Sequence, residues 1–233
     1  MRFFALNILM FFDFFHKRKI LAALKNLLKD KHATILDVGG HKGESIFFFK
    51  KNFNVSKIYT FEPIESNFIQ LKKETKKISE KIIYCNFALG KKDEKKKIKK
   101  MIETSSSTLN EINEHSNYYK RKKLFLGIKN EKKMFSEKDV CIKKGIDVIE
   151  NFKINSVDLL KIDTEGYEYN VIKGFENSIN KINSIIFEHH YDLMIKKEYT
   201  YSDINKYLKN KGFHMKYKFK MPFRKTFEYI YSK

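Results

Sequence analysis

Short apolar runs of strand length alternate with longer helical stretches along most of the chain. Apolar runs occupy residues 33–38, 57–62, 81–88, 156–163 and 184–190. Most of them precede a stretch whose apolar residues recur every three or four positions, which is typical of a helix packed on a sheet. The helix expected at 167–174 ends on Gly174, which we assign to its C-terminal cap position.

The pattern changes to a period of two near the end of the chain. Phe213, Met215, Tyr217 and Phe219 alternate with polar residues, and residues 226–232 supply a returning strand. The pattern therefore predicts an α/β fold with a parallel sheet that ends in an antiparallel hairpin.

Two segments lie outside this alternation. Residues 1–30 predict an N-terminal helical extension, whose apolar start is too short for a membrane-spanning helix. Packing on its own domain is the favoured reading, with a membrane surface or a partner protein as alternatives. Residues 31–233 are expected to form one domain with a polar, lysine-rich insertion near 103–139, irregular and partly helical.

Composition changes this picture little. The 233 residues are 42% hydrophobic and carry a formal net charge of +20, almost all of it from lysine. Proteins that read nucleic acid rely heavily on arginine, so we interpret the lysines as a solvated surface. Cys85 and Cys141 have no paired spacing, so neither a disulfide nor a zinc site is predicted, and a cytoplasmic location fits best.

A glycine-rich loop follows the first apolar run in the sequence ILDVGGHKG. Its Asp37, Gly39, Gly40 and Gly43 lie where a strand should end and a helix begin, and Glu62 ends the next strand. An acidic residue at this separation is expected to bind a ribose. The loop lacks the pyrophosphate-binding pattern G-x-G-x-x-G, which favours S-adenosylmethionine as the ligand. The alternative is that the glycines serve turn geometry only.

Six motifs in order extend this hypothesis: ILDVGGHKGE, FEPIESNF, NFALG, SSSTL, LLKIDTEGYEYNVIKGFE and IIFEHH. The chain resembles the FkbM-family methyltransferases over about residues 33–213. The resemblance implies a class I, Rossmann-like methyltransferase fold with a mostly parallel seven-stranded sheet and helices on both faces. It also implies an S-adenosylmethionine-dependent enzyme. The chain departs from the family at His41, where asparagine is usual.

The resemblance implies the following contacts with S-adenosylmethionine. Asp37 orients the loop and the methionine end, Glu62 binds the ribose, and Asn86 pairs with the adenine edge or caps a loop. The remaining expected contacts are Gly39, Gly40, His41, Gly43 and Ala88. Residues 105–107, three serines, are expected in a loop over the cofactor or the acceptor.

Catalytic candidates lie at the ends of the fourth and fifth expected strands. Asp163 and Glu165 could act as a base, orient the acceptor or hold a cation, or a residue of this loop could cap the next helix. Neighbouring strand residues face opposite ways, so at most one of His189 and His190 points into the cleft, and the resemblance favours His189.

Three functions compete. The leading one is an O-methyltransferase that acts on a hydroxyl of a saccharide or related polyhydroxylated metabolite. An RNA methyltransferase would suit the charge, although the chain has no N-P-P-Y-type loop for exocyclic amines. The third is a non-catalytic protein that retains the fold.

Overall fold

Seven strands form the central sheet of the protein. The computed structural model describes residues 2–101, 107–128 and 134–233, and gives only the backbone of residues 2–14. The strand order in the sheet is β10-β11-β9-β8-β1-β2-β3. These strands are β1 (Ala33–Val38), β2 (Val55–Phe61), β3 (Ile82–Cys85), β8 (Val157–Ile162), β9 (Ile182–His190), β10 (His214–Lys220) and β11 (Thr226–Ser232).

The pairing of these strands confirms the expected fold. β3, β2, β1, β8 and β9 run parallel, whereas β11 lies antiparallel between β9 and β10. Both faces of the parallel part are covered, which explains why its strands read as continuous apolar runs. The carboxyl ends of five parallel strands therefore meet at one edge, the carboxyl edge.

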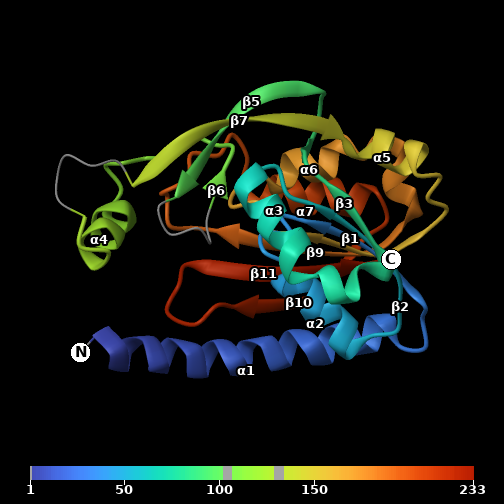
Figure 1. The fold of residues 1–233 in the computed structure, drawn as a ribbon, viewed down its shortest axis with the longest axis horizontal. Helices are drawn as coiled ribbons and strands as arrows, with labels where there is room; N and C mark the ends of the chain where they lie inside the picture. Colours follow the sequence, from blue (N-terminus) through green and yellow to red (C-terminus); the bar gives the residue numbers. More distant parts are fainter. Residues whose placement is uncertain (1, 102–106, 129–133) are drawn as a thin grey trace.

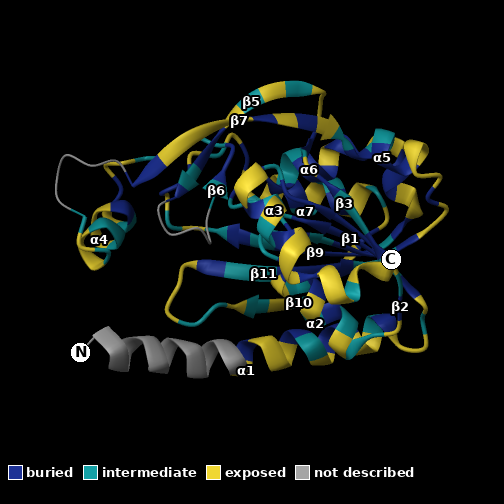
Figure 2. Cartoon of the chain, in the orientation of Figure 1, coloured by how far each residue is buried: buried dark blue, intermediate teal, exposed yellow. Residues whose placement is uncertain are grey.

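Helices cover the two faces of the sheet in separate layers (Figure 1). Buried side chains from one set of helices pack on one face, and those from the other set pack on the opposite face. The parallel strands are mostly buried, and the outer surfaces of the helices are exposed (Figure 2). The first set is α1 (Arg2–Leu28), α2 (Glu44–Asn52) and α3 (Glu65–Glu74), and the second is α5 (Gly145–Asn151), α6 (Glu168–Gly174) and α7 (Tyr201–Asn210). Two 3₁₀ turns, Lys76–Lys81 and Glu176–Lys181, lead into β3 and β9.

A second sheet differs from the sequence-based expectation. It has the order β4-β7-β5-β6 and contains β4 (Ala88–Gly90), β5 (Glu94–Met101), β6 (Ser107–Thr108) and β7 (Phe135–Lys144). We expected no strand in the lysine-rich sequence of β5, because Ile98 and Met101 are its only apolar residues and their spacing of three shows no alternation. Within the expected insertion, α4 (Asn117–Phe125) is helical.

The C-terminal half of α1 packs on the domain. Ile20, Ala23 and Leu24 are buried in the cluster that covers one face of the sheet. The His16 side chain hydrogen-bonds the carboxylate of Glu228 on β11, and Asn26 donates to the Tyr217 hydroxyl at 3.2 Å. No helix within the described ranges is both long and apolar enough to cross a membrane.

Gly174 is needed for packing and not for the cap geometry expected from sequence. It is the last residue of α6, and Phe175 at the C-cap has an ordinary φ of −79°. A Cβ atom at Gly174 would lie 1.9 Å from the Gly90 carbonyl oxygen. The glycine thus lets α6 rest directly on the backbone of β4, which joins the second sheet to the first.

Replacing Gly174 with alanine should therefore destabilise the protein, although alanine favours helices. We expect Gly174→Ala to lower the free energy of unfolding by roughly 1–3 kcal/mol, the usual cost of overpacking. Urea denaturation would measure it, with the exposed neighbour Lys173→Ala as a control expected to change it by less than about 0.5 kcal/mol. An unchanged Gly174→Ala midpoint would contradict the close approach.

Candidate active site

A cleft lies at the carboxyl edge of the parallel strands. Its empty volume is about 640 Å³, and residues from β1, β2, β8, the second sheet and the loops between them enclose it. The cleft thus occupies the place where doubly wound sheets bind ligands. Its lining is Val38, Gly39, His41, Phe61, Glu62, Pro63, Ile64, Asn67, Ala88, Leu89, Ile98, Ser107, Leu109, Asp163, Thr164 and Glu165.

The glycine loop forms one wall of the cleft. The backbone amides of Gly39 and Gly40 both donate to the Phe61 carbonyl oxygen at 3.0 Å. Gly39 has a φ of +85°, and a Cβ there would lie 2.0 Å from the carbonyl oxygen of Asp163. The loop therefore lies in direct backbone contact with the segment that follows β8, and only glycine permits this approach.

A buried ion pair holds the loop from beneath. The Lys161 Nζ lies 3.1 Å from an Asp37 carboxylate oxygen and 3.6 Å from one of Asp163, and it donates to the Gly39 carbonyl at 3.2 Å. The other Asp37 oxygen accepts from Ser45 and Thr60. Burial alone would lower the pKa of Lys161, but Asp37 and Asp163 raise it above its ordinary value. The amine is thus charged in the folded protein.

This arrangement changes the role expected for Asp37. Its carboxylate is fully buried and does not line the cleft. It binds Ser45 at the start of α2, Thr60 on β2 and Lys161 on β8 instead. Asp37 orients the loop, as expected, but it makes no wall for the methionine end of a cofactor.

Glu62 is placed as the sequence predicts, at the end of β2 and in the cleft wall. Its carboxylate accepts from the backbone amides of His41 at 3.0 Å and Ile64 at 2.9 Å, which fixes its direction. Burial raises its pKa to about 7, although these hydrogen bonds oppose the shift. Asn67 also reaches Glu62, at 3.5 Å, and lines the cleft. The sequence analysis missed Asn67, which follows Glu62 by five residues on α3.

The cleft contains buried polar atoms that lack partners within the described part of the chain. His41 Nε2 and Ser107 Oγ are two such atoms, and both residues line the cleft. The other His41 ring nitrogen lies 3.1 Å from Glu44, and this contact lowers the pKa of Glu44 to about 2. Polar atoms without partners in a largely apolar wall suit a ligand that brings its own polar groups, as a nucleoside does.

Some cofactor contacts expected from sequence differ in position. Ala88 and the loop glycine Gly39 line the cleft, whereas Gly40, Gly43 and Asn86, like Asp37, do not. The Asn86 side chain donates to the carbonyls of Glu62 at 2.9 Å and Pro63 at 3.3 Å, the loop-capping role that was the alternative. Apolar side chains supply the surface suited to an adenine ring, among them Phe61, Ile64, Leu89, Ile98 and Leu109.

The loop after β8, residues 163–167, forms the opposite wall. Asp163, Thr164 and Glu165 line the cleft, and Glu165 has a φ of +50°, an uncommon conformation for a residue with a Cβ. The fully buried Glu168 accepts from the Gly166 amide and the Tyr199 hydroxyl, both at 2.6 Å. Helix α6 begins at Glu168 without a side-chain cap, so the alternative that Asp163 or Thr164 caps it is wrong.

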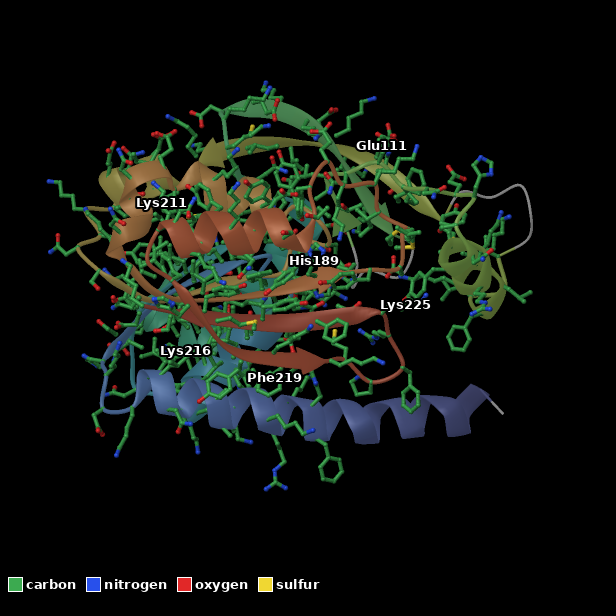
Figure 3. The ribbon with its side chains drawn as sticks, turned by 180° about the vertical axis from the view of Figure 1, so that it is seen from behind. Glu111, His189, Lys211, Lys216, Phe219 and Lys225 are labelled. Carbon is green, nitrogen blue, oxygen red and sulfur yellow. The ribbon has the colours of Figure 1, made fainter. Side chains whose placement is uncertain are left out.

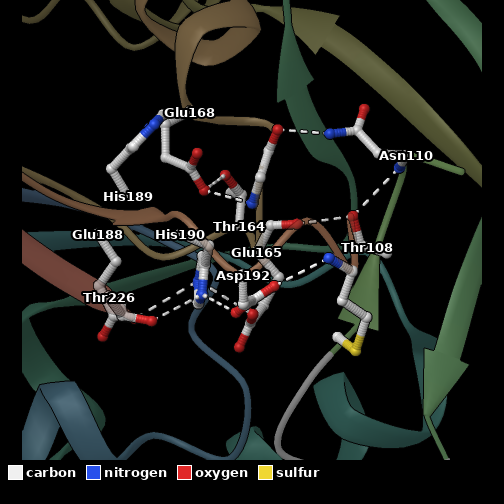
Figure 4. Close-up of polar contacts among 12 residues, drawn as sticks. Thr108, Asn110, Thr164, Glu165, Glu168, Glu188, His189, His190, Asp192 and Thr226 are labelled. Atoms are coloured by element: carbon white, nitrogen blue, oxygen red, sulfur yellow. Dashed lines mark hydrogen bonds and ion pairs between the residues drawn. The ribbon is translucent and has the colours of Figure 1, made fainter. Parts of the chain in front are cut away.

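The second sheet and its following loop hold the same loop from outside. Thr108 donates to the Glu165 carbonyl at 2.7 Å, and Asn110 donates to the Gly166 carbonyl (Figure 4). The Tyr199 hydroxyl also lies 2.8 Å from the Gly166 carbonyl oxygen, so its single proton is shared between this oxygen and Glu168. The conformation of Glu165 is therefore fixed by contacts from three segments.

The structure turns His190, and not the expected His189, toward Glu165. The His189 ring is buried among tyrosines, 4.7 Å from the Tyr191 ring, and burial lowers its pKa to about 3. The His190 Nε2 lies 3.2 Å from Glu165, and its Nδ1 lies 3.0 Å from the Thr226 hydroxyl (Figure 4). Strand parity predicted that only one histidine would face the cleft side, but not which one.

Carboxylates surround His190. Glu188 and Asp192 lie 3.8 Å from its ring, in addition to Glu165. Burial alone would lower the pKa of His190, but Asp192 and Glu165 raise it to about 9. Burial raises the pKa of Glu165 and that of Glu188, with the neighbouring carboxylates adding to the effect. The site thus holds more carboxylates than cations.

The serine loop expected over the cleft is only partly within the described residues. Residues 105 and 106 of the serine loop lie outside the described residues, and Ser107 lines the cleft. Within the described residues, no group of three or more histidine, cysteine, aspartate or glutamate side chains is arranged to hold a metal ion.

Comparisons with known proteins agree with this architecture. The family model for the methyltransferase FkbM domain matches residues 37–215. Methyltransferase FkbM from Methylobacillus flagellatus KT is similar in structure, with 15% identity and a TM-score of 0.50 over 85% of this chain and 43% of that protein. The chain thus spans less than half of that relative. A comparison with curated proteins gave no match.

Two other solved structures share the fold. M. capricolum TrmK, in complex with S-adenosyl-homocysteine, is 10% identical with a TM-score of 0.53, over 92% of this chain and 67% of that one. Sp1610 from Streptococcus pneumoniae, a putative tRNA (m1A22) methyltransferase, is 11% identical with a TM-score of 0.52, over 93% of this chain and 68% of that one. At these identities the likeness concerns the fold.

Removing the Lys161 cation beneath the cleft should destabilise the fold. We expect Lys161→Met to lower the free energy of unfolding by about 3 kcal/mol, because Asp37 is left buried without its counter-ion. Chemical denaturation would measure it. The matched control is Lys31→Met, which breaks a half-exposed pair with Asp158 and should cost less than about 1 kcal/mol. Equal losses of unfolding free energy in the two variants would show that the Lys161–Asp37 pair contributes no more to stability than the more exposed pair.

The affinity for S-adenosylmethionine should depend on pH through Glu62. Below its pKa of about 7 the carboxyl is protonated, and above it both oxygens are free of protons and able to accept hydrogen bonds from the hydroxyls of a bound ribose. Calorimetry should therefore show roughly threefold to tenfold tighter binding as pH rises from about 6 to about 8. Glu62→Gln should bind more weakly, by about 1–3 kcal/mol, without this pH dependence. A variant with the wild-type profile would remove Glu62 from the ribose site.

Proposed function

The chain belongs to the FkbM methyltransferase family and uses S-adenosylmethionine as its methyl donor. From this premise we propose that it transfers the methyl group to a hydroxyl of a saccharide or a related polyhydroxylated metabolite. The observation that carries the proposal is the position of Asp163 and Glu165. Both line the donor cleft, and Glu165 lies against His190 at 3.2 Å.

In this proposal one part of the cleft binds the methyl donor and another part binds the acceptor. Glu62 would hold the ribose, and the apolar wall that includes Ile64 and Leu89 would hold the adenine. When bound, S-adenosylmethionine supplies an electrophilic methyl group on a sulfonium. The loop 163–165 lies across the cleft from these residues and is the segment available to an acceptor.

Glu165 is the residue best suited to take the proton of the acceptor hydroxyl. A hydroxyl needs a base to become nucleophilic, and a base works best when its pKa lies near the working pH. Burial raises the pKa of Glu165, and its carboxylate contacts His190 on one side. Asp163, which is more exposed and pairs with Lys161, is suited to orienting the acceptor.

The neighbouring groups favour a polyhydroxylated acceptor. Asp163, Glu165, Glu188 and Asp192 all lie at the ends of β8 and β9, and their carboxylate oxygens accept hydrogen bonds. His190, a donor when protonated, lies among them and holds Glu165 in place. Several acceptors close together match the several hydroxyl donors of a sugar.

A second candidate, an RNA methyltransferase, is favoured by one observation. A larger cleft, with an empty volume of about 1,220 Å³, adjoins the donor cleft and shares Leu109 with it. Five lysines line it, together with three glutamates: Lys91, Lys92, Lys96, Lys196 and Lys197. Such a surface would attract phosphates, but its partial neutralisation by glutamate supports the saccharide proposal over this one.

An assay of S-adenosylhomocysteine release across acceptors would separate the two. Under the saccharide proposal, release above background is expected with members of a panel of glycosides and not with total RNA. Release with RNA alone would replace the proposal by the second candidate. Release with neither class, despite donor binding, would contradict both.

The base assignment predicts a specific loss of turnover. We expect Glu165→Gln to lower kcat by roughly 10²- to 10⁴-fold, the usual contribution of general acid–base catalysis. Calorimetry should show donor affinity within about threefold of wild type, because Glu165 does not serve the ribose or adenine. Asp163→Asn is the paired variant and should raise the acceptor KM more than it lowers kcat. The reverse outcome would assign the base to Asp163.

A further inference from the structure

Exposed apolar side chains gather near the carboxyl edge. Ten large hydrophobic side chains are exposed in the described part of the chain, and four of them are scattered: Phe47, Ile69, Phe152 and Met215. The other six occupy four short segments and are named here the apolar rim: Phe15, Leu124, Phe125, Tyr191, Leu193 and Phe223. Leu124 and Leu193 are the most exposed of all, at 82% and 77%.

A series of hydrogen bonds places these segments side by side. The Asn113 amide, just before α4, donates to the Met194 carbonyl at 2.7 Å, which brings α4 to residues 191–194. The Tyr191 amide donates to the Lys225 carbonyl at 2.7 Å, which joins the same residues to the turn between β10 and β11. The His16–Glu228 contact then joins that hairpin to α1.

The pictures agree with this order. Figure 1 shows α4, the β10–β11 turn and the N-terminal half of α1 on one side of the molecule. Figure 3 shows the same arrangement from behind, with Lys225 in the turn above α1. His190 directly precedes the rim residue Tyr191 in the chain, and Glu165 lies 3.2 Å from the His190 ring. The acceptor side of the cleft therefore lies beside the rim.

Arginine is concentrated in the segments of the rim. The chain has only four arginines, at positions 2, 18, 121 and 224, and all four belong to α1, α4 or the β10–β11 turn. Lysines lie between them, with three in α4 alone. The segments that carry the rim thus combine exposed apolar side chains with cations that bind phosphate well, among them Arg121 and Arg224.

We propose that the apolar rim docks on the surface of an anionic phospholipid membrane. Apolar side chains that enter the acyl boundary and cations that pair with lipid phosphates are the two attractions by which proteins lie on membranes. The two most exposed rim residues are leucines, which insert among acyl chains but do not stack on bases as aromatic side chains do. The residues at these two most exposed positions therefore favour lipid over nucleic acid.

Docking in this way turns the acceptor side of the cleft toward the lipid headgroups. A saccharide carried on a lipid would then reach Asp163 and Glu165 without leaving the membrane. This choice of acceptor rests on the proposed function, whereas membrane docking itself rests on the rim alone.

Vesicle co-sedimentation of the full chain tests the proposal. The vesicles are phosphatidylcholine with about 30% phosphatidylglycerol, and phosphatidylcholine alone, at moderate salt. We expect binding to the anionic vesicles only. Leu124→Glu/Leu193→Glu should weaken this binding at least about tenfold, because it removes two inserting side chains and adds two repelled charges.

The matched control is Phe47→Glu/Ile69→Glu, which makes the same change in charge at two exposed apolar positions outside the rim. It should bind the anionic vesicles within about twofold of wild type. Equal weakening of the two variants would overturn the rim as the docking surface, and so would undiminished binding of the rim variant.

Two further readouts separate the alternatives. Competition by single-stranded RNA that removes the protein from anionic vesicles, with the rim variant losing RNA affinity equally, would assign the rim to nucleic acid and overturn the proposal. Calorimetry with S-adenosylmethionine checks the donor cleft of each variant. Vesicle binding without donor binding in the wild type would contradict the proposed function and would not affect the docking proposal.

Discussion

The charge of Lys161 is the constraint on which the site depends. A buried ammonium is costly unless it is paired and hydrogen-bonded, and this one satisfies that need with Asp37, Asp163 and the Gly39 carbonyl. Asp37 comes from β1 and Lys161 from β8, so the pair spans the two central strands. The same amine therefore fixes the glycine loop on one side of the cleft and the loop after β8 on the other.

Contacts from several segments hold the loop after β8, which has an uncommon conformation. Glu165 has a positive φ, which is costly for a residue with a Cβ and needs support from surrounding contacts. Glu168 supplies it from the start of α6, Tyr199 from the segment before α7, Thr108 from the second sheet and Asn110 from the loop that follows it. Much of the conformational cost of positioning Glu165 is thereby met during folding, as the proposed catalytic role requires. The second sheet thus belongs to the site as much as to the fold.

The sequence predicted most of the fold because the apolar runs and the glycine loop are local signals. It placed Glu62 and Asp163 correctly at strand ends. It could not predict that Asn86 caps a loop or that Gly174 serves contact with Gly90, since both depend on neighbours distant in the chain. The alternation of side chains along a strand indicated that at most one of His189 and His190 faces the cleft. It could not show which of the two does. The strand β5 was missed because lysines fill most of its positions, and its two apolar residues, Ile98 and Met101, are three positions apart and so show no period of two.

If the methyl donor binds between Glu62 and Asp163, with both walls held by Lys161, a crystal structure of the complex with S-adenosylhomocysteine will show it. The ribose hydroxyls should lie within hydrogen-bond reach of Glu62 and the adenine against Ile64 and Leu89, while the Lys161 contacts with Asp37 and Gly39 stay unchanged. A ligand bound in the lysine-lined cleft, or a glycine loop that leaves Lys161 on binding, would rule out this placement.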